Sequence, residues 1–443
     1  MTLNPEFQRQ LYLECSRTRL VGIPLVLGII FTFSSLLDGY RLGEASEQTA
    51  LILYLLATLL WGARQAVDSV LDEYRERTWD NQRLSALGAW ELAWGKLAGS
   101  TSMAWYAGAL CLAVFSIASD RPAALPQIWF YGFFSALLVQ SASLLLGQLA
   151  MQREQSKSGA ILLLAVAAFI FMSGRLSDLA DSPTQLIGFL PPATAAWYGL
   201  GISNDTFLQL SLIFAVCWCL IGNYRLMGHA LGIRQLPSAW LGFVTFLIVY
   251  LGGFLPYFES MGNLLPSYAF TFELTAFTVC IVLTYFGLLC EDNRAIRINR
   301  LLTGIQQANW RRVGEETPIW WLTLGLSLPC AIPLVFAEQS AFNFGRWLHF
   351  FPLAMVLLLI RDCALYLYFY YGKHAQRALN LSLLSATLLY VVLPGLFSTL
   401  GMSGLSALFF PLWADSEASA AFCAALQCTV MFYLLAQRWR SGT

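Results

Sequence analysis

Long apolar runs separated by short polar segments dominate the pattern of this chain. A hydrocarbon core of about 30 Å is crossed by about 20 helical residues, and runs suited to that length occur twelve times. The pattern therefore predicts an all-α polytopic membrane protein with twelve transmembrane helices. The predicted spans lie near residues 20–37, 49–65, 101–118, 127–149, 158–174, 207–224, 239–256, 267–289, 318–337, 347–370, 379–397 and 417–436.

The polar segments between these runs predict the orientation of the chain. If the N-terminus is cytoplasmic, 22 of the 26 lysines and arginines fall in inside segments. Basic residues concentrate on the cytoplasmic side of membrane proteins, so we expect both termini to be cytoplasmic. The four basic residues left outside are Arg41, Arg121, Arg175 and Arg346.

The two halves of the chain share landmarks at an offset of about 220 residues. This offset predicts two six-helix repeats, residues 1–227 and 228–443. Six spans each would make the repeats parallel, related by an axis along the membrane normal. The landmark pairs are Leu20 with Trp240, Asp72-Glu73 with Glu291-Asp292, Trp90 with Trp310, residues 152–157 with 373–377, and residues 189–191 with 409–411.

Composition supports a membrane protein and excludes several functions. Hydrophobic residues make up 58% of the chain and charged residues 12%, against about 25% charged in soluble domains. The net charge of zero offers no nucleic acid a basic surface. The ten cysteines and three histidines show no disulfide or metal-ligand spacing. The chain should therefore bind no metal or other cofactor itself.

The pair Gly95-Lys96 suggests a phosphate-binding P-loop, but its surroundings exclude one. A P-loop needs four residues between its first glycine and Gly-Lys, followed by serine or threonine. Here six residues separate Gly88 from Gly95, and Leu97 takes the hydroxyl position.

An inside segment of about 35 residues, from Arg64 to Ala98, follows the second span. It is much longer than a connection between packed helices requires. Glu76-Arg77-Thr78, Leu84, Ala89-Trp90-Glu91 and Gly95-Lys96 resemble the segment after the second span in permeases of type-2 ATP-binding-cassette (ABC) exporters. A helix-start pattern at Asn4-Pro5-Glu6 and an amphipathic stretch from Phe7 to Arg19 agree with that family.

The resemblance implies a permease subunit in a membrane, expected to be a bacterial inner membrane. Residues of about 66–97 would be a coupling helix docking on a separate ATPase subunit, which would hold ATP and Mg²⁺. Two ATPase copies and membrane lipids are the implied partners. The resemblance leaves open whether periplasmic or further membrane subunits also take part. The implied coupling residues of this segment are Glu76, Arg77, Thr78, Trp79, Asp80, Leu84, Gly95 and Lys96.

The second half departs from this pattern. Its equivalent segment, about residues 291–317, keeps Trp310 and an apolar spacing suited to an amphipathic helix, but has no Gly-Lys pair. We expect a degenerate second coupling segment that includes Arg297, Arg300 and Trp310. The family also implies short re-entrant helices between the fifth and sixth spans of the first half, although a helix lying at the membrane interface would fit the composition equally.

Charged and polar residues inside predicted spans leave two interpretations open. Arg361 and Asp362 lie deep in the tenth span, where charges are costly and face the bundle interior or water. They form either a structural ion pair or the lining of a polar route, to which Gln140 of the fourth span would add.

Three functions fit these observations to different degrees. The first is an ATP-driven export permease that is not itself an enzyme. The alternative is a twelve-span secondary transporter driven by an ion gradient, against which the long inside segments and the shortage of paired intramembrane acids count. A membrane enzyme or scaffold ranks last, because the outside loops carry few convergent titratable groups.

Overall fold

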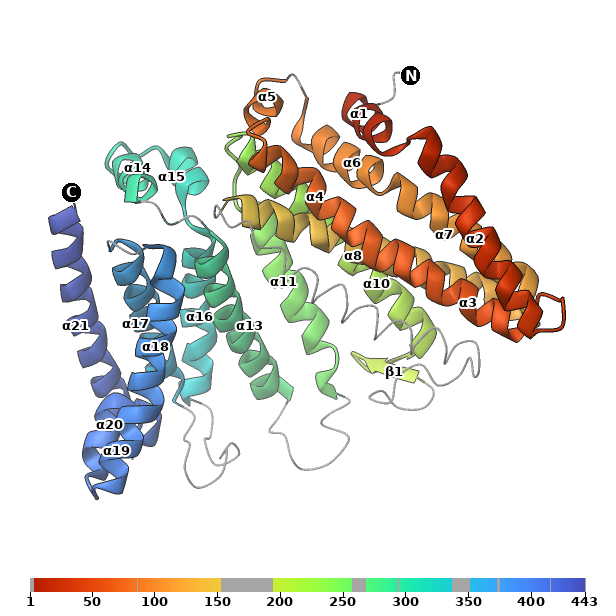
Figure 1. Ribbon diagram of the computed structural model, residues 1–443. Helices are drawn as coiled ribbons and strands as arrows, with labels where there is room; N and C mark the ends of the chain where they lie inside the picture. The colour runs from red at the N-terminus through yellow and green to blue at the C-terminus, as the bar shows by residue number, and fades with distance from the viewer. Residues whose placement is uncertain are drawn as a thin grey trace. The chain divides into compact units, whose positions relative to one another are not determined.

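Apolar helices dominate the computed structural model of this chain, which describes residues 4–85, 87–152, 194–256, 268–291, 293, 295–336, 351–372, 375–414 and 416–442 (Figure 1). Among these described residues, nine helices are long and apolar enough to cross a membrane. The chain is therefore an all-α integral membrane protein. One two-stranded hairpin is the exception to helical structure within the described ranges.

The chain divides into two compact units, of which the first comprises residues 1–195 and 201–235. Within it, α3 packs against α7, and α8 packs against both α4 and α10. Its elements are α1 (Pro5–Glu14), α2 (Arg17–Leu37), α3 (Glu44–Leu55), the π-helical η1 (Leu56–Trp61), α4 (Gly62–Arg75), α5 (Trp79–Arg83), α6 (Ala89–Ser100), α7 (Ser102–Ala118), η2 (Pro122–Ala124), α8 (Leu125–Gln152) and α10 (Asn204–Ala230).

The second unit comprises residues 196–200 and 236–443. It also contains two pairs of packed apolar helices: α13 packs against α16, and α17 packs against α21. Its elements are α11 (Ser238–Gly252), α13 (Tyr268–Cys290), α14 (Ala295–Gln306), α15 (Trp310–Glu316), α16 (Ile319–Phe336), α17 (Pro352–Tyr370), η4 (Ala375–Arg377), α18 (Ala378–Thr387), the π-helical η5 (Leu388–Val392), α19 (Leu393–Thr399), α20 (Ser403–Phe409), η6 (Pro411–Trp413) and α21 (Glu417–Gly442).

The predicted spans fall on helices wherever the structure describes them. Two of these helices differ from a simple crossing, and one predicted span lies outside the described residues. The third span is α7, which meets α6 at a bend of 48°. The seventh is α11, whose 15 residues are short for a full crossing. The fifth, at residues 158–174, lies outside the described residues, as do residues 153–157 of one landmark and the landmark at 189–191. Twelve spans and their orientation therefore stay predictions.

The outside segment expected to form re-entrant helices is a hairpin in its described part. Strands β1 (Thr194–Trp197) and β2 (Leu200–Ser203) pair there, so that expectation is wrong for residues 194–203. The indole of Trp197 donates to the backbone oxygen of Tyr250 at 3.0 Å, and the Tyr198 hydroxyl to that of Val249 at 2.8 Å. The hairpin is thus tied to carbonyls near the end of α11, where few backbone donors remain, and Val249 accepts from both the Tyr198 hydroxyl and the backbone N–H of Gly253.

A π-helical break in the second span is tied to its neighbours by Gln140. The side-chain amide of Gln140 donates to the backbone oxygen of Thr58 in η1 at 3.0 Å. Its oxygen accepts from the indole of Trp105 on α7 at 2.9 Å. A π-helical segment displaces carbonyls from their usual partners, so Gln140 supplies a donor that the helix lacks. This geometry accounts for Gln140 as a structural residue.

Replacing Gln140 with leucine should therefore destabilise the first unit. The Thr58 carbonyl and the Trp105 indole would each lose a buried partner, and one unmade buried hydrogen bond costs about 1–3 kcal/mol. We expect a decrease of that size in the free energy of unfolding, measured by chemical denaturation in micelles. Ser143→Ala is the control, because Ser143 is buried on the same helix and its hydroxyl has no hydrogen-bond partner among the described residues. Equal effects of both variants would contradict this role.

Candidate functional site

The segment after α4 turns sharply at Arg77. The backbone N–H of Thr78 donates to the oxygen of Glu73 at 2.9 Å, and that of Arg77 to the oxygen of Tyr74 at 3.2 Å. This pair of bonds is the Schellman ending of a helix, whose left-handed position usually holds glycine. Arg77 occupies that position with φ of +57°, at a cost of about 1–2 kcal/mol for a residue with a Cβ. An exposed arginine consequently stands at the turn.

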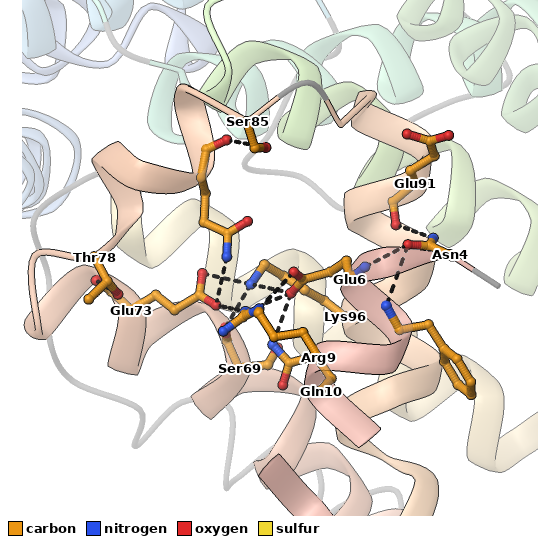
Figure 2. A network of polar contacts seen from close by, with 12 residues as sticks. Asn4, Glu6, Arg9, Gln10, Ser69, Glu73, Thr78, Ser85, Glu91 and Lys96 are labelled. Carbon is orange, nitrogen blue, oxygen red and sulfur yellow. Dashed lines mark hydrogen bonds and ion pairs between the residues drawn. The ribbon is translucent and has the colours of Figure 1, made fainter. Parts of the chain in front are cut away.

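Four charged side chains from α1, α4 and α6 meet close to this turn (Figure 2). The Lys96 ammonium lies 2.6 Å from a carboxylate oxygen of Glu73 and 3.1 Å from one of Glu6. It also donates to the backbone oxygen of Ser69 at 3.2 Å. Arg9 pairs with Glu6 at 2.8 Å and with Glu73. We call Glu6, Arg9, Glu73 and Lys96 the charge cluster, in which two cations balance two anions.

Lys96 is the most constrained member of the charge cluster, with a side chain 0% exposed. Its ammonium forms ion pairs with Glu6 and Glu73 and donates a hydrogen bond to the Ser69 oxygen. Its nitrogen also lies 5.9 Å from the centre of the Trp79 ring. A buried charge is tolerated only when it is paired and hydrogen-bonded in this way, so Lys96 holds α1, α4 and α6 together.

Two glycines on α6 permit the close approach of α1. A Cβ on Gly95 would lie 2.8 Å from the Cβ of Glu6, and one on Gly99 would lie 2.5 Å from the Cβ of Gln10. Small residues four positions apart allow helix backbones to pack closely. The asparagine cap of α1 adds a polar tie, because the Asn4 amide donates to the backbone oxygen of Glu91 on α6 at 2.7 Å. Gly95 and Lys96 thus serve packing within the chain.

The remaining predicted residues of this segment divide between an inner and an outer face. Trp79 is buried against the core of the unit. Thr78 is half-buried and its hydroxyl donates to the Glu73 oxygen at 3.2 Å. The outer face, which we call the α5 surface, consists of the exposed residues Glu76, Arg77, Asp80, Arg83 and Leu84.

The α5 surface combines mixed charge with an apolar point. Leu84 is 87% exposed, whereas the other side chains carry two negative and two positive charges. Beside it, a pocket of about 340 Å³ is lined by Leu71, Tyr74, Arg75 and Arg77. The α5 surface thus presents one exposed apolar side chain, a balanced set of charges and an adjoining pocket to its surroundings.

The equivalent segment of the second unit is built differently. Arg297 points inward, where it donates to the backbone oxygens of Glu316 at 3.0 Å and Thr317 at 3.2 Å and pairs with Glu291. Glu291 also accepts from the backbone N–H of Ile319, the first residue of α16, at 2.7 Å. These contacts fix α14 and α15 to the ends of α13 and α16.

The other two predicted residues of that segment are exposed. Arg300 lies on the outer side of α14, and Trp310 is 73% exposed at the start of α15. The structure therefore does not bring Arg297, Arg300 and Trp310 together on one surface.

Arg361 and Asp362 belong to a buried polar network of the second unit. Arg361 donates to Asp362 at 2.9 Å and to the side-chain oxygen of Gln427 on α21. The hydroxyls of Tyr285 and Tyr390 each donate to the second oxygen of Asp362 at 2.8 Å. Four elements, α13, α17, η5 and α21, thus contribute to it, and every charge is paired. This geometry favours the structural interpretation of the pair over a polar route.

Sequence reasoning missed the partners that complete these clusters. Glu6, at the predicted helix start, and Arg9 are spaced one helical turn apart, but nothing local shows that they face a lysine about 90 residues later. Glu73 lies at the predicted cytoplasmic end of the second span and is one of the landmarks shared by the two halves, but the sequence does not show which residue pairs with it. Among the described residues, no group of three or more His, Cys, Asp or Glu side chains could hold a metal ion.

Comparison of the chain with known protein families, curated proteins and solved structures finds no significant match.

Removing the Lys96 charge should release α1 from the first unit. Lys96→Met leaves Glu6 and Glu73 with one cation, and breaking a buried charge pair costs about 3–5 kcal/mol. We expect trypsin to cleave after Arg9 at least tenfold faster in the full-length variant, measured by mass spectrometry of the N-terminal peptides. Arg83→Met, which removes an exposed arginine 3.9 Å from Asp80, should leave that rate unchanged. Cleavage at the parental rate in Lys96→Met would contradict the role of Lys96 in holding α1.

Lowering the pH should also weaken the contact of α1 with the first unit, because it protonates Glu6. Burial alone would raise the pKa of Glu6, but hydrogen bonds from Arg9 and Gln10 and the charge of Lys96 lower it from 4.5 to about 2. A lowered pKa means that the unfolded state binds more protons, so the contribution of Glu6 is complete above about pH 4.5 and is lost as the pH falls toward 2. Hydrogen exchange of residues 5–14 in nanodiscs, corrected for intrinsic rates, should lose protection in that window. Glu6→Gln should abolish this dependence, whereas protection that stays constant in the parent would contradict it.

Proposed function

We propose that this chain is the permease subunit of an ATP-driven ABC transporter, working as an exporter, whose ATPase is a separate polypeptide docked on the α5 surface. The observation that carries the proposal is an exposed α5 surface next to a rigid base, by which we mean the helices α1, α4 and α6 that the charge cluster joins. Leu84 and the charges beside it face outward, while the charge cluster joins the helices behind them.

The charge cluster supports transmission of force from such a partner. A push on α5 reaches α4 through the turn at Arg77 and reaches α6 through Trp79, which packs with α6 residues in one apolar cluster. Lys96 then links α4 to α1 and α6. Because α6 continues into α7 across a bend of 48°, movement of the base changes the direction of a membrane helix. Rigid-body motion of packed elements is a common way to switch access.

The packing of the two units supports a permease built from two parallel six-helix repeats with cytoplasmic termini. In both units the second predicted span packs on the third, and the fourth packs on the sixth. An acid near the end of the second span fixes the following segment in each, Glu73 through Lys96 and Glu291 through Arg297. The bacterial inner membrane and the export direction follow from the family resemblance.

The proposal assigns ATP and Mg²⁺ to the partner and no reaction to this chain. Two ATPase copies would form the motor, as the family resemblance implies. The principal contact belongs to the first unit, because Gly95 and Lys96 stabilise its base and leave the α5 surface outward. The second unit holds Arg297 inside its own packing, so its contact with the second copy would differ.

Disrupting the α5 surface should remove the ATPase. The full-length chain, purified from its native membranes in mild detergent, should carry Mg²⁺-dependent ATPase activity. Asp80→Arg and Leu84→Glu should each reduce the copurifying activity at least tenfold, since central interface residues carry most of the binding energy. Asp120→Arg, the same substitution at an exposed acid in the loop after α7, is the matched control.

Two outcomes would contradict the proposal. Equal losses in Asp80→Arg and Asp120→Arg would show that the α5 surface has no special role. A purified chain without any ATPase that moves protons or sodium ions across liposomes would favour the ion-driven alternative.

A further inference from the structure

The α5 surface and helix α14 expose different chemistry. In the first unit the apolar residue Trp79 is buried, and the α5 surface has one exposed apolar side chain. In the second unit, α14 exposes Leu302 at 48% and Ile305 at 47%, next to the half-exposed Ile298. At 100° per residue these three side chains share one side of α14, whereas Ile296 lies on the opposite side.

The position of α14 and α15 is set by their connections to membrane helices. α13 ends at Cys290 and α16 begins at Ile319, so both ends of the segment lie next to apolar helices that fit a membrane. Arg297 and Glu291 hold it there. In Figure 1, α14 and α15 lie beyond one end of α13 and α16. The segment is therefore close to the bilayer surface, and its apolar side needs a cover.

Charge and aromatic content indicate what that cover is. Residues 295–316 hold four arginines and two glutamates, one of which, Glu316, is buried. Arg311 is 85% exposed at its side chain, pairs with Glu315 at 3.1 Å and follows the exposed Trp310. Tryptophan favours the headgroup level of a bilayer, and basic residues beside a membrane are attracted by anionic lipids. A basic amphipathic helix with these features lies in the membrane interface.

We propose that α14 and α15 form an anchor on an anionic lipid surface. Ile298, Leu302 and Ile305 enter the boundary between headgroups and acyl chains, Trp310 lies at headgroup level, and the guanidinium groups of Arg311 and Arg312 face lipid phosphates. The anchor goes beyond the proposed function and does not depend on it, because the residues of the α5 surface take no part.

The anchor implies different roles for α14 and for the α5 surface. An interfacial helix moves with the bilayer surface, so α14 resists tilting of α13 and α16 toward or away from the membrane plane. The α5 surface, which has little apolar area to insert, stays available in water. A membrane with more anionic lipid would hold the second unit more firmly.

Accessibility of a spin label tests the anchor in the full-length chain without any partner. Cys217 is the exposed cysteine among the ten and is first replaced by serine. Nitroxide labels then go on Ile305→Cys and, as the matched control, on Ile296→Cys. In nanodiscs of phosphatidylcholine and phosphatidylglycerol, the label at 305 should meet oxygen more than a water-soluble nickel chelate, and the label at 296 the reverse.

Lipid charge provides the second arm of this experiment. Nanodiscs of phosphatidylcholine alone, or the double substitution Arg311→Glu and Arg312→Glu in mixed lipid, should weaken insertion of the label at 305. Loss of two basic residues near an anionic surface corresponds by itself to roughly thirtyfold in the docking equilibrium, and the two added glutamates should make the decrease larger.

Three results would overturn the anchor. The first is a label at 305 as open to the nickel chelate as the label at 296 in mixed-lipid nanodiscs. The second is exclusion of both reagents from the label at 305, which would indicate a protein cover. The third is insertion that is the same with and without anionic lipid.

Discussion

The fully buried Lys96 is the constraint on which the first unit depends. Its ammonium is stable only because two carboxylates and one backbone oxygen surround it. Those acceptors come from α1 and α4, so the lysine fixes three helices with one set of contacts. The glycines of α6 make this geometry attainable, because any larger side chain at Gly95 or Gly99 would hold α1 away. Charge and shape therefore act together at a single helix junction.

The same principle appears in the second unit with different residues. Arg361 is buried, and its charge is balanced by Asp362 and extended to Gln427, Tyr285 and Tyr390. Each unit thus contains a neutral network that links elements distant in the sequence. Such networks are costly when incomplete, and they limit the alternative packings open to a bundle of otherwise interchangeable apolar helices.

Much of the fold could be predicted from the sequence, because bilayer thickness imposes a length on every apolar run. Helices such as α10 and α13 lie within a few residues of their predicted spans. The α5 surface and the burial of Lys96 could not be distinguished in the same way. Both lie in one polar segment, and only a partner far away in the chain, Glu6, decides which residues turn inward. The two tyrosines that donate to Asp362 could not be predicted either, because they lie on other helices and no short-range sequence pattern links them to Asp362.

The docking of α1 on α6 has a consequence for the order in which the protein matures. Asn4 and Glu6 are synthesised about 90 residues before the backbone oxygen and the lysine that they bind. During translation, α1 therefore lacks these partners until α6 emerges from the ribosome. Because α6 precedes α8 and α10 in the chain, α1 can dock before the rest of its unit is made, and any delay in inserting the first two spans prolongs its exposure to proteases.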